Sequence, residues 1–394
     1  MKALNEPIAR LCALVCNLIF AAGAAAAWGA PAQQAEFRTV TIRNTEPRRD
    51  VTGAIVDAHD GNLLFAEGRY YLYGTAYGKS AGFGINNRFR VYSSPDLQDW
   101  TFEGELLKSP PDGVHYNPSV VYNQRTHKYV LWYNWYPKLW DGQVGVAVSD
   151  TPVGPFTIVN RRVGITQADQ KPGAGTLFVD DDGTGYYIYT AIGAAFGASA
   201  GANLPHHSVR VERLTSDFLG STGQVSDVLA SGCEATSMLK HDGRYYALFD
   251  TTCCFCKEGS GARVYVASNP LGPYTEKQNI NRPTGHGPTV AGQQASIARI
   301  PTPSGEALVW VADRWGSRPD GVKGHDFQFW SEPLRFDSEG NIAPIADVSE
   351  WSLKVRVASE PSMHSAKPYI WPKKKDPHPL KIDPCTGAAL QPEE

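Results

Sequence analysis

Two acidic residues, Asp60 and Glu234, stand at similar places ahead of two Tyr-rich segments of the chain. Asp60 lies ten positions before Tyr70, and Glu234 lies eleven positions before Tyr245. If the two segments are equivalent parts of a repeated fold, both carboxylates face one cavity. Carboxylates on two sides of a cavity can act as general acid and as base or nucleophile, which is the chemistry of glycosidic bond hydrolysis.

Asp60 closes a short polar cluster, Asp57-Ala-His59-Asp60, that precedes a run of strand-forming residues. In a regular strand Asp57 and His59 share one face and Asp60 points to the other, because successive side chains alternate. The cluster is therefore not expected to form a single metal site. We predict Asp60 as the functional carboxylate and His59 as its neighbour in the cavity wall.

One pattern recurs between residues 52 and 336: a Gly turn, an alternating Tyr-rich strand, and a Ser-x-x-Pro-Leu or Gly-Pro-aromatic turn. Five copies follow one another at a spacing of about 60 residues, which is typical of stacked supersecondary units. Helical periodicity is almost absent. We predict an all-β fold, a five-bladed β-propeller whose innermost strands direct their first residues into a central funnel. The Tyr-rich strands read GRYYLYG, HKYVLWY, GTGYYIYT, GRYYALF and EALVWVA.

These residues resemble glycoside hydrolase family 43, five-bladed propellers that include arabinanases, arabinofuranosidases, xylosidases and exo-β-1,3-galactanases. The resemblance extends over residues 53–334. The family's base aspartate precedes a Tyr-Tyr pair as Asp60 does, and its acid motif has the spacing of Glu234 to Gly243. The phrases FVDDDGTGYYIY and YSSPDLQDW are also similar to the family. Subfamilies related to exo-β-1,3-galactanase are the most similar, through Ala58-His59, Gln294-x-Ser296 and Asp313-Arg-Trp315.

The resemblance implies an inverting glycoside hydrolase acting on arabinan, arabinoxylan or β-1,3-galactan, with Glu234 as general acid and Asp60 as general base. A polysaccharide or oligosaccharide is then the partner. No cofactor is required for this chemistry and no metal ligands are assigned. A structural calcium ion in the funnel stays open as an alternative.

The chain departs from the family at the third active-site aspartate, where it has Ala174. That aspartate orients the acid and raises its pKa in the family. Asp169, in a nearby Gly/Pro loop, is a candidate replacement. The acid motif also reads Glu-Ala-Thr instead of Glu-Ala-Pro. These departures favour a second hypothesis, a propeller that binds glycans without cleaving them.

Further side chains are candidates for substrate or water contacts. We expect Gln294 and His59 to position the attacking water or an ion. The alternative for Gln294 is that it is an ordinary polar residue of a strand, without a role in the site. Sugar faces pack on aromatic rings, but aromatic residues of propellers also fill the space between blades. The candidates for sugar contact are Tyr116, Trp135, Trp315 and Trp330.

The first residues place Lys2 and Arg10 ahead of a short apolar run and small residues, as in a secretory signal peptide. We expect a signal peptide at residues 1–32, a linker at 33–50, the propeller at 51–350, and a closing segment with a flexible tail at 351–394. The formal net charge is −3, which argues against a nucleic-acid partner. We expect a secreted or periplasmic monomer with no membrane association after cleavage.

The Cys-Cys-Phe-Cys stretch holds a Cys-x-x-Cys pair, Cys253 and Cys256. No second pair or spaced histidines stand near it, so a disulfide is favoured over a zinc site in an oxidising compartment. The acidic run Val179–Gly183 suggests calcium. Its consecutive acids do not have the alternate spacing of calcium ligands, so a hairpin turn is preferred.

Overall fold

The five-bladed propeller is present in the computed structural model, which describes residues 35–138, 141–166, 170–193, 207–251, 255–358 and 367–375. Contacts divide the chain into residues 1–35 and 36–394, and all strands belong to the second unit. The expected signal peptide at 1–32 lies outside the described residues. Among the described residues, no helix has the length and apolarity to cross a membrane.

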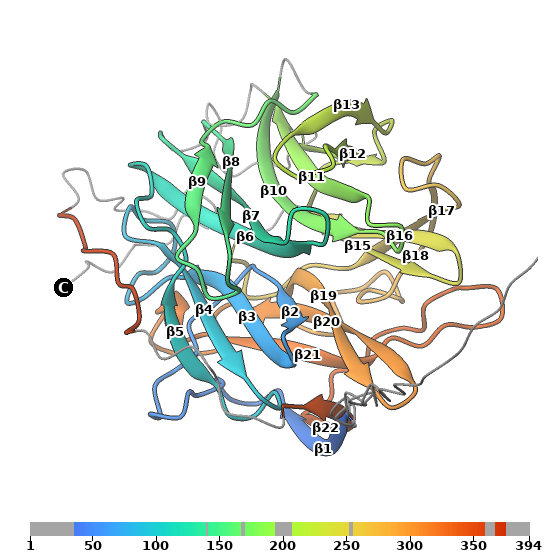
Figure 1. The fold of residues 1–394 in the computed structure, drawn as a ribbon. Helices are drawn as coiled ribbons and strands as arrows, with labels where there is room; N and C mark the ends of the chain where they lie inside the picture. Colours follow the sequence, from blue (N-terminus) through green and yellow to red (C-terminus); the bar gives the residue numbers. More distant parts are fainter. Residues whose placement is uncertain are drawn as a thin grey trace, which may run out of the picture. The chain divides into compact units, whose positions relative to one another are not determined.

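Five antiparallel sheets form the blades (Figure 1). Each sheet runs in chain order from the innermost strand outwards. Neighbouring blades contact each other in sequence through β3 with β6, β6 with β10, β10 with β15 and β15 with β19, and the contact of β19 with β2 closes the ring. The fold class predicted from the repeats is therefore confirmed. The blades are: β2 (Leu63–Ala66), β3 (Arg69–Ala76), β4 (Arg88–Ser94), β5 (Thr101–Glu105); β6 (Val114–Asn123), β7 (Lys128–Tyr136), β8 (Gln143–Ser149), β9 (Thr157–Asn160); β10 (Gln170–Val179), β11 (Gly185–Gly193), β12 (His207–Leu214), β13 (Ser221–Val225), with β14 (Ala230–Ser231) beside β12; β15 (Cys233–His241), β16 (Arg244–Thr251), β17 (Arg263–Ala267), β18 (Thr275–Asn279); β19 (Gln293–Thr302), β20 (Gly305–Arg314), β21 (Phe327–Pro333).

The Tyr-rich segments are the second strands of the blades, where both sheet faces pack against other blades. All eight residues of β3 are buried, for example. The outermost strands differ: β9 and β13 are mostly exposed, and the polar sequence TEKQN of β18 is suited to an unpaired edge. The Tyr pattern therefore marks the two-sided core of each blade.

Side chains of the inner strands join each blade to the next. Polar side chains hydrogen-bond to the backbone of the following blade, from the inner strands or just ahead of them in the first four blades and from Gln328 of β21 in the fifth, which fixes the blades relative to one another. These bonds are Asn62 with both backbone groups of Val120, Ser119 from Leu177 N–H (3.0 Å), Thr176 to Thr236 O (3.0 Å), Ser237 from Ile297 N–H (3.1 Å) and Gln328 to Ala58 O (3.1 Å).

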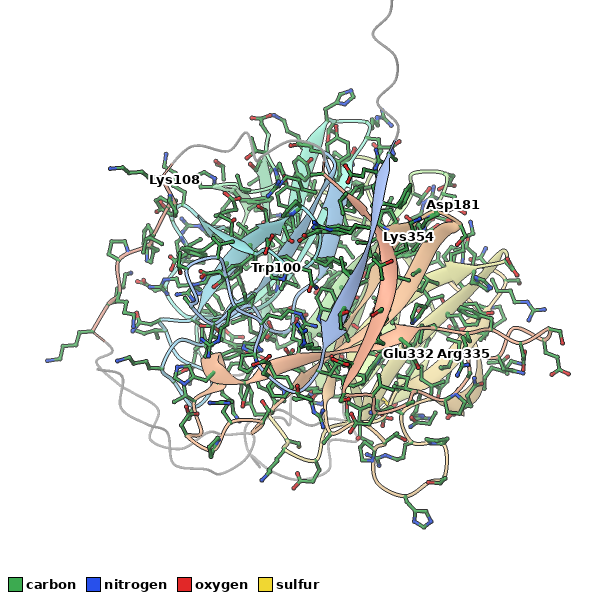
Figure 2. The ribbon with its side chains drawn as sticks, turned by 90° about the horizontal axis from the view of Figure 1, so that it is seen from below. Trp100, Lys108, Asp181, Glu332, Arg335 and Lys354 are labelled. Carbon is green, nitrogen blue, oxygen red and sulfur yellow. The ribbon has the colours of Figure 1, made fainter. Side chains whose placement is uncertain are left out.

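Two segments outside the blades differ from the sequence prediction. The stretch predicted as a linker contains strand β1 (Glu36–Arg43), which pairs along its whole length with β22 (Glu350–Val357). Figure 2 shows the two strands side by side, with Lys354 on β22. Val40 and Val355 bury their side chains in the core shared by the first and last blades. The pair thus covers the junction of these blades and adds no strand to the ring.

Residues 367–375 belong to the Pro- and Lys-rich tail that was predicted to be flexible, and the structure places them against the first blade. Tyr369 forms a bridge with Gly104 of β5, and the backbone N–H of Trp371 donates to the Glu105 carboxylate at 2.6 Å. Lys374 pairs with Asp112. This part of the tail therefore docks on the first blade through backbone hydrogen bonds that composition alone does not predict.

Candidate active site

The backbone around Asp60 is held in an uncommon conformation by a close crossing of two segments. Asp60 has φ of 47°, in the left-handed region that costs a non-glycine residue energy. His59 pairs with Thr75 in an isolated bridge. A Cβ atom at Gly61 would lie 2.1 Å from the carbonyl oxygen of Tyr73. The missing side chain at Gly61 therefore allows the close approach that fixes Asp60.

The carboxyl group of Asp60 is buried beside a second carboxylate. Its backbone N–H donates to Asp313 Oδ2 at 2.8 Å, and the Tyr77 hydroxyl donates to Asp60 Oδ2 at 2.9 Å. Burial, followed by the charge of Asp313, raises the pKa of Asp60 to about 7. Asp60 Oδ1 is buried and makes no hydrogen bond of normal geometry with the described residues. Asp60 as a whole is partly exposed, and its carboxyl group can accept a proton from a bound water near neutral pH.

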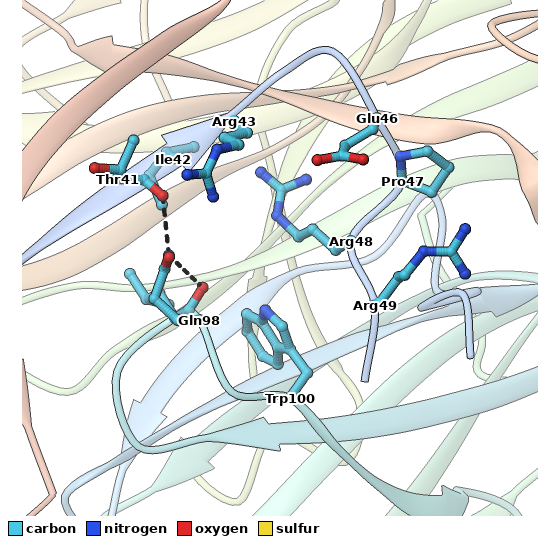
Figure 3. A pocket seen from close by; sticks show the side chains of 10 residues that line it. Thr41, Ile42, Arg43, Glu46, Pro47, Arg48, Arg49, Gln98 and Trp100 are labelled. Carbon is cyan, nitrogen blue, oxygen red and sulfur yellow. Dashed lines mark hydrogen bonds between the residues drawn. The ribbon is translucent and has the colours of Figure 1, made fainter. Parts of the chain in front are cut away.

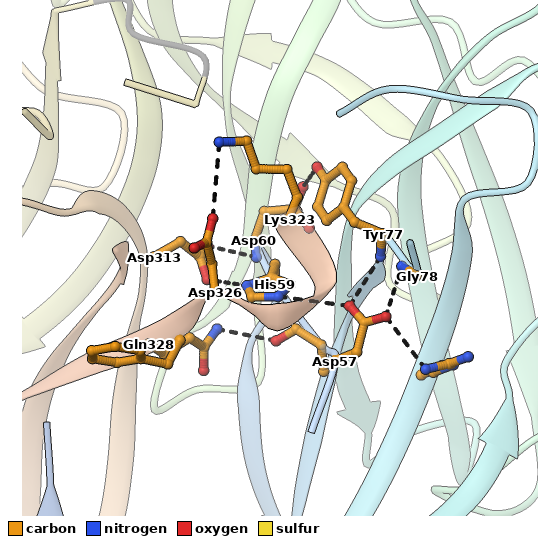
Figure 4. A network of polar contacts seen from close by, with 12 residues as sticks. Asp57, His59, Asp60, Tyr77, Gly78, Asp313, Lys323, Asp326 and Gln328 are labelled. Carbon is orange, nitrogen blue, oxygen red and sulfur yellow. Dashed lines mark hydrogen bonds and ion pairs between the residues drawn. The ribbon is translucent and has the colours of Figure 1, made fainter. Parts of the chain in front are cut away.

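His59 joins two further carboxylates behind Asp60 (Figure 4). Its Nδ1 lies 3.0 Å from Asp313 Oδ1, and its Nε2 lies 3.6 Å from Asp57 Oδ1. Burial alone would lower the pKa of His59, but the hydrogen bond to Asp313 and the charges of Asp313, Asp57 and Asp60 raise it to about 9. The ring is therefore cationic at neutral pH and balances the acidic group. His59 and Asp57 share a face, as strand alternation predicts.

Asp57 fixes the connection that carries Tyr77. Its two oxygens accept the backbone N–H groups of Tyr77 at 3.0 Å and Gly78 at 2.8 Å, and Arg90 approaches at 3.4 Å. Each bond to a charged acceptor is stronger than a neutral one. Asp57 thus positions Tyr77, whose hydroxyl donates to Asp60. The bonds from Tyr77 and Gly78 to Asp57 come from backbone N–H groups and not from that hydroxyl.

Glu234 lies at a bulge near the start of β15. The pairing with β16 shifts between Glu234 and Ser237, and Ala235 has φ of 57°. A bulge changes the direction of neighbouring side chains. The Gln293 amide donates to Glu234 Oε1 at 2.9 Å, and its oxygen accepts the Trp315 indole N–H at 2.8 Å. Trp315 in turn contacts the rings of His59 and Tyr77 at 5.0 and 5.5 Å. This chain of contacts links the proposed acid to the surroundings of the proposed base.

Gln294, predicted to hold water or an ion, bonds to protein groups. Its amide nitrogen donates to the carbonyl oxygens of Ala235 at 2.5 Å and Leu248 at 2.9 Å. Its oxygen accepts the Trp310 indole N–H at 2.9 Å. Gln294 therefore secures the bulge that follows Glu234, and its observed contacts are structural.

An aromatic cluster surrounds the acidic groups. Tyr116 and Trp315, both predicted to contact sugar, belong to it, and Ala174 packs against it. Phe255 joins the two sides, with ring centroids 5.1 Å from Phe83 and 4.9 Å from Trp315. The position of the family's third aspartate thus borders the site, but it supplies an apolar contact here. The other buried members are Tyr77, Val114 and Tyr136.

The remaining two tryptophans lie outside the aromatic cluster, in the cores between blades. Trp330 is fully buried at the junction of the first and last blades, and its ring packs under the Arg48 guanidinium at 4.2 Å. Trp135 is 5% exposed, and its indole donates to the Arg161 carbonyl at 2.8 Å. Tyr116 and Trp315 are buried to a similar degree, so burial alone does not separate the four candidates. Sugar contact by Trp135 and Trp330 stays a prediction, and both rings lie in clusters other than the one that contains Tyr116, Trp315 and Tyr77.

Asp313, Gln293 and Asn117 were not predicted as site residues. Asn117 donates to the Asp60 carbonyl at 2.7 Å and accepts the Gly175 N–H at 2.6 Å. It therefore ties the base to the third blade. Asp313 does stand in the Asp-Arg-Trp phrase that resembles the family, and Gln293 directly precedes Gln294. The Asp-Arg-Trp phrase and the position next to Gln294 were the signals that the sequence offered for Asp313 and Gln293. Neither signal reveals which residue the side chain bonds to.

Asp169 and Cys253 lie outside the described residues. Cys256 is disulfide-bonded, and Cys233 is a buried free thiol. Within the described ranges, no group of three or more His, Cys, Asp or Glu side chains is arranged to hold a metal ion. The Val179–Gly183 acids lie at the turn between β10 and β11, where Asp180 pairs with Lys240 at 2.6 Å.

A five-bladed propeller with an aspartate ahead of the inner strand of the first blade and a glutamate on the inner strand of the fourth blade defines a class of carbohydrate-active folds. The chain belongs to glycosyl hydrolases family 43, whose model matches residues 54–315.

Individual relatives agree with this assignment. The arabinoxylan arabinofuranohydrolase of Paenibacillus polymyxa is 26% identical over 257 residues, which are 55% of this chain and 39% of the relative. The chain thus spans well under half of that protein. A family 43 β-1,3-galactosidase solved with galactodeoxynojirimycin is similar with a TM-score of 0.66 and 25% identity, covering 79% of this chain and 99% of that one. An exo-β-1,3-galactanase from Phanerochaete chrysosporium has a TM-score of 0.65 and 25% identity, covering 81% and 71%.

Proposed function

We propose that the protein is an inverting glycoside hydrolase that cleaves O-glycosidic bonds in plant- or algal-type polysaccharides. The observation that carries the proposal is the state of Asp60: its carboxyl group is buried beside Asp313, with a pKa of about 7. A base with this pKa is poised to take a proton from water near neutral pH. Membership of family 43 supports the reaction class.

In the proposed reaction Glu234 donates its proton to the glycosidic oxygen while Asp60 accepts one from the attacking water. The water attacks the anomeric carbon from the face opposite the leaving group, so the configuration inverts. This arrangement needs a separation of about 6.5–9.5 Å between the two carboxyl groups. Both proton transfers are assigned to side chains, and no cofactor takes part in them.

The relatives direct the choice of substrates. The names of the relatives mention arabinoxylan, β-1,3-galactoside and β-1,3-galactan. We propose that this chain acts on a substrate of the same polysaccharide class, with Tyr116 and Trp315 contacting the sugar. Both belong to the aromatic cluster that borders Asp60 through Tyr77.

The experiment is incubation of the purified protein with arabinan, arabinoxylan and β-1,3-galactan, next to Glu234→Gln. Release of sugar by the parent and loss of that release in the variant support hydrolysis. Retention of a labelled oligosaccharide without release, equal in parent and variant, would instead support the glycan-binding alternative. Ala174 favours that alternative, because it provides an apolar contact where the family has a carboxylate.

We also propose that the protein is exported and acts as a monomer outside the cytoplasm. The charged and apolar pattern of residues 1–32 supports export. The disulfide at Cys256 is of a kind that persists in oxidising compartments. Fractionation of producing cells and N-terminal sequencing of the mature chain test the proposal.

A further inference from the structure

A cavity of about 190 Å³ lies between the first strand of the chain and the first blade (Figure 3). It is lined by Thr41 and Arg43 of β1, by Glu46, Arg48 and Arg49 in the following segment, and by Gln98 and Trp100 ahead of β5. Its volume is well above the roughly 30 Å³ that one water occupies in the liquid. None of these residues contributes to the candidate active site.

Two residues that line this cavity, Arg48 and Trp100, each have a buried hydrogen-bond donor without an acceptor in the described part of the chain. These donors are Arg48 Nη2 and Trp100 Nε1. In Figure 3 the indole nitrogen of Trp100 faces the guanidinium group of Arg48. Two donors cannot bond to each other, and an unsatisfied buried donor is destabilising. An acceptor placed between them would satisfy both.

The Arg48 guanidinium is held firmly enough to present that nitrogen. It lies 4.2 Å above the Trp330 ring, and its Nη1 donates to the Gln328 carbonyl at 2.8 Å. Burial lowers the pKa of Arg48 to about 9, so the group remains charged at neutral pH without a carboxylate bonded to it. A negative charge in the cavity would offset this burial.

The other charged groups of the lining also favour an anion. Arg43 and Arg49 add two positive charges, and Glu46 is the single acid among the lining residues. Arg43 lies 3.9 Å from Glu350, a long contact between exposed groups, and Arg49 donates to the Gly53 carbonyl at 2.7 Å. Gln98 uses its amide nitrogen on the carbonyl groups of Thr41 and Leu97.

We propose that this cavity is a binding site for an oxyanion, one oxygen of which accepts hydrogen bonds from both Arg48 Nη2 and Trp100 Nε1. Carboxylate, sulfate and phosphate groups share the required chemistry, since planar guanidinium groups bind each of them through charge-assisted hydrogen bonds. The group can belong to a free inorganic ion or to an acidic sugar unit of a polysaccharide. A water molecule supplies the acceptor but not the charge.

The test is a titration of the full chain with sulfate, phosphate, galacturonate and neutral galactose at constant ionic strength, followed by calorimetry. The ¹⁵N-labelled indole signal of Trp100, assigned with Trp100→Phe, gives a local readout. We expect saturable binding of at least one anion, no binding of galactose at this site, and a shift of the Trp100 signal. If galacturonate binds and sulfate and phosphate do not, the ligand is an acidic sugar unit. If sulfate or phosphate binds and galacturonate does not, the ligand is a free inorganic ion.

The variants separate the site from general charge effects. Arg48→Met and Trp100→Phe are expected to weaken binding about tenfold or more, as loss of a charge-assisted bond does. Arg49→Met, which removes a positive charge but neither buried donor, weakens it less, and Glu46→Gln strengthens it. If Arg48→Met does not fold, the proposal is still tested by the affinity of Trp100→Phe for the anion and by the shift of the Trp100 indole signal in the parent protein. Absence of saturable anion binding, or equal weakening by Arg49→Met and Trp100→Phe, would overturn the proposal.

Discussion

Asp313 accepts a hydrogen bond from the backbone N–H of Asp60 at 2.8 Å. The other oxygen of the same carboxylate lies 3.0 Å from the His59 ring. One residue of the fifth blade thus fixes the position of the proposed base and also raises its pKa. This relationship makes the acidic group in the funnel sensitive to single substitutions.

Asp313→Asn is expected to shift the ascending limb of the pH profile of kcat/KM toward lower pH. The substitution removes the charge that, after burial, contributes most to the raised pKa of Asp60, while an amide oxygen can still accept the backbone bond. Since the base must be deprotonated, a lower pKa lets activity begin at more acidic pH. The control is Asp320→Asn, because Asp320 is exposed and lies in the connection that follows β20. An unchanged limb in Asp313→Asn would contradict the role of Asp60 as base.

Stability should fall as the pH rises from about 4 to 9. A carboxyl group whose pKa rises to about 7 on folding loses stabilisation between its ordinary value and 7, and His59 does so between 6.5 and about 9. The full shifts correspond to about 4 kcal/mol for Asp60 and about 3 kcal/mol for His59 as upper bounds. Urea unfolding at pH 5, 7 and 9 measures the slope. Asp60→Asn should flatten the dependence of the unfolding free energy on pH below about pH 7, and His59→Gln should flatten it above about pH 6.5. A rise in stability from pH 5 to pH 9 in the parent protein would refute both assignments.

Trp315→Phe should lower kcat about tenfold with little change in KM, as expected from one lost positioning hydrogen bond. Phenylalanine keeps an aromatic face but cannot donate to Gln293, whose amide holds Glu234. Trp135→Phe is the matched control, because its indole donates to the distant Arg161 carbonyl. Equal effects of the two substitutions would show that Trp315 acts through general packing.

Gly61→Ala is expected to abolish activity and to lower the unfolding midpoint. The new Cβ would lie 2.1 Å from the Tyr73 carbonyl oxygen, so the crossing that holds Asp60 must open. Gly164→Ala places a Cβ in open space and should be neutral. Thermal unfolding and initial rates of both variants test this prediction. Full activity in Gly61→Ala would show that the close approach is dispensable.

The repeats were enough to predict the blades, because the period and the Tyr-rich strands are local features. The offset from those strands also led to Asp60 and Glu234 as candidates, and Tyr116 was chosen for its place just ahead of the second-blade strand, whereas Trp315 was chosen by residue type. The bonding of Asp313 to Asp60 joins residues 253 positions apart, which no local pattern encodes. The pairing of β1 with β22 was missed for the same reason.

Burial limited the prediction for the other candidates. Trp135 and Trp330 have the residue type suited to sugar stacking, but whether an aromatic ring faces a funnel or a neighbouring blade depends on tertiary packing. Gln294 shows a similar limit, since its polar group is used by the backbone of Ala235 and Leu248. Ala174 could be recognised as a departure from the family, whereas its contact with the aromatic cluster required the structure.

The central claim is that Asp60 activates water for an inverting hydrolysis in which Glu234 is the acid. Time-resolved ¹H NMR of the anomeric protons, with the polysaccharide that the protein cleaves, tests it most directly when wild type is compared with Asp60→Asn. We predict that the first product has the anomeric configuration opposite to the substrate, and that Asp60→Asn releases at least about 100-fold less sugar, in line with the loss of a general base. Retained configuration in the first product, or sugar release by folded Asp60→Asn at the wild-type rate, would contradict the claim.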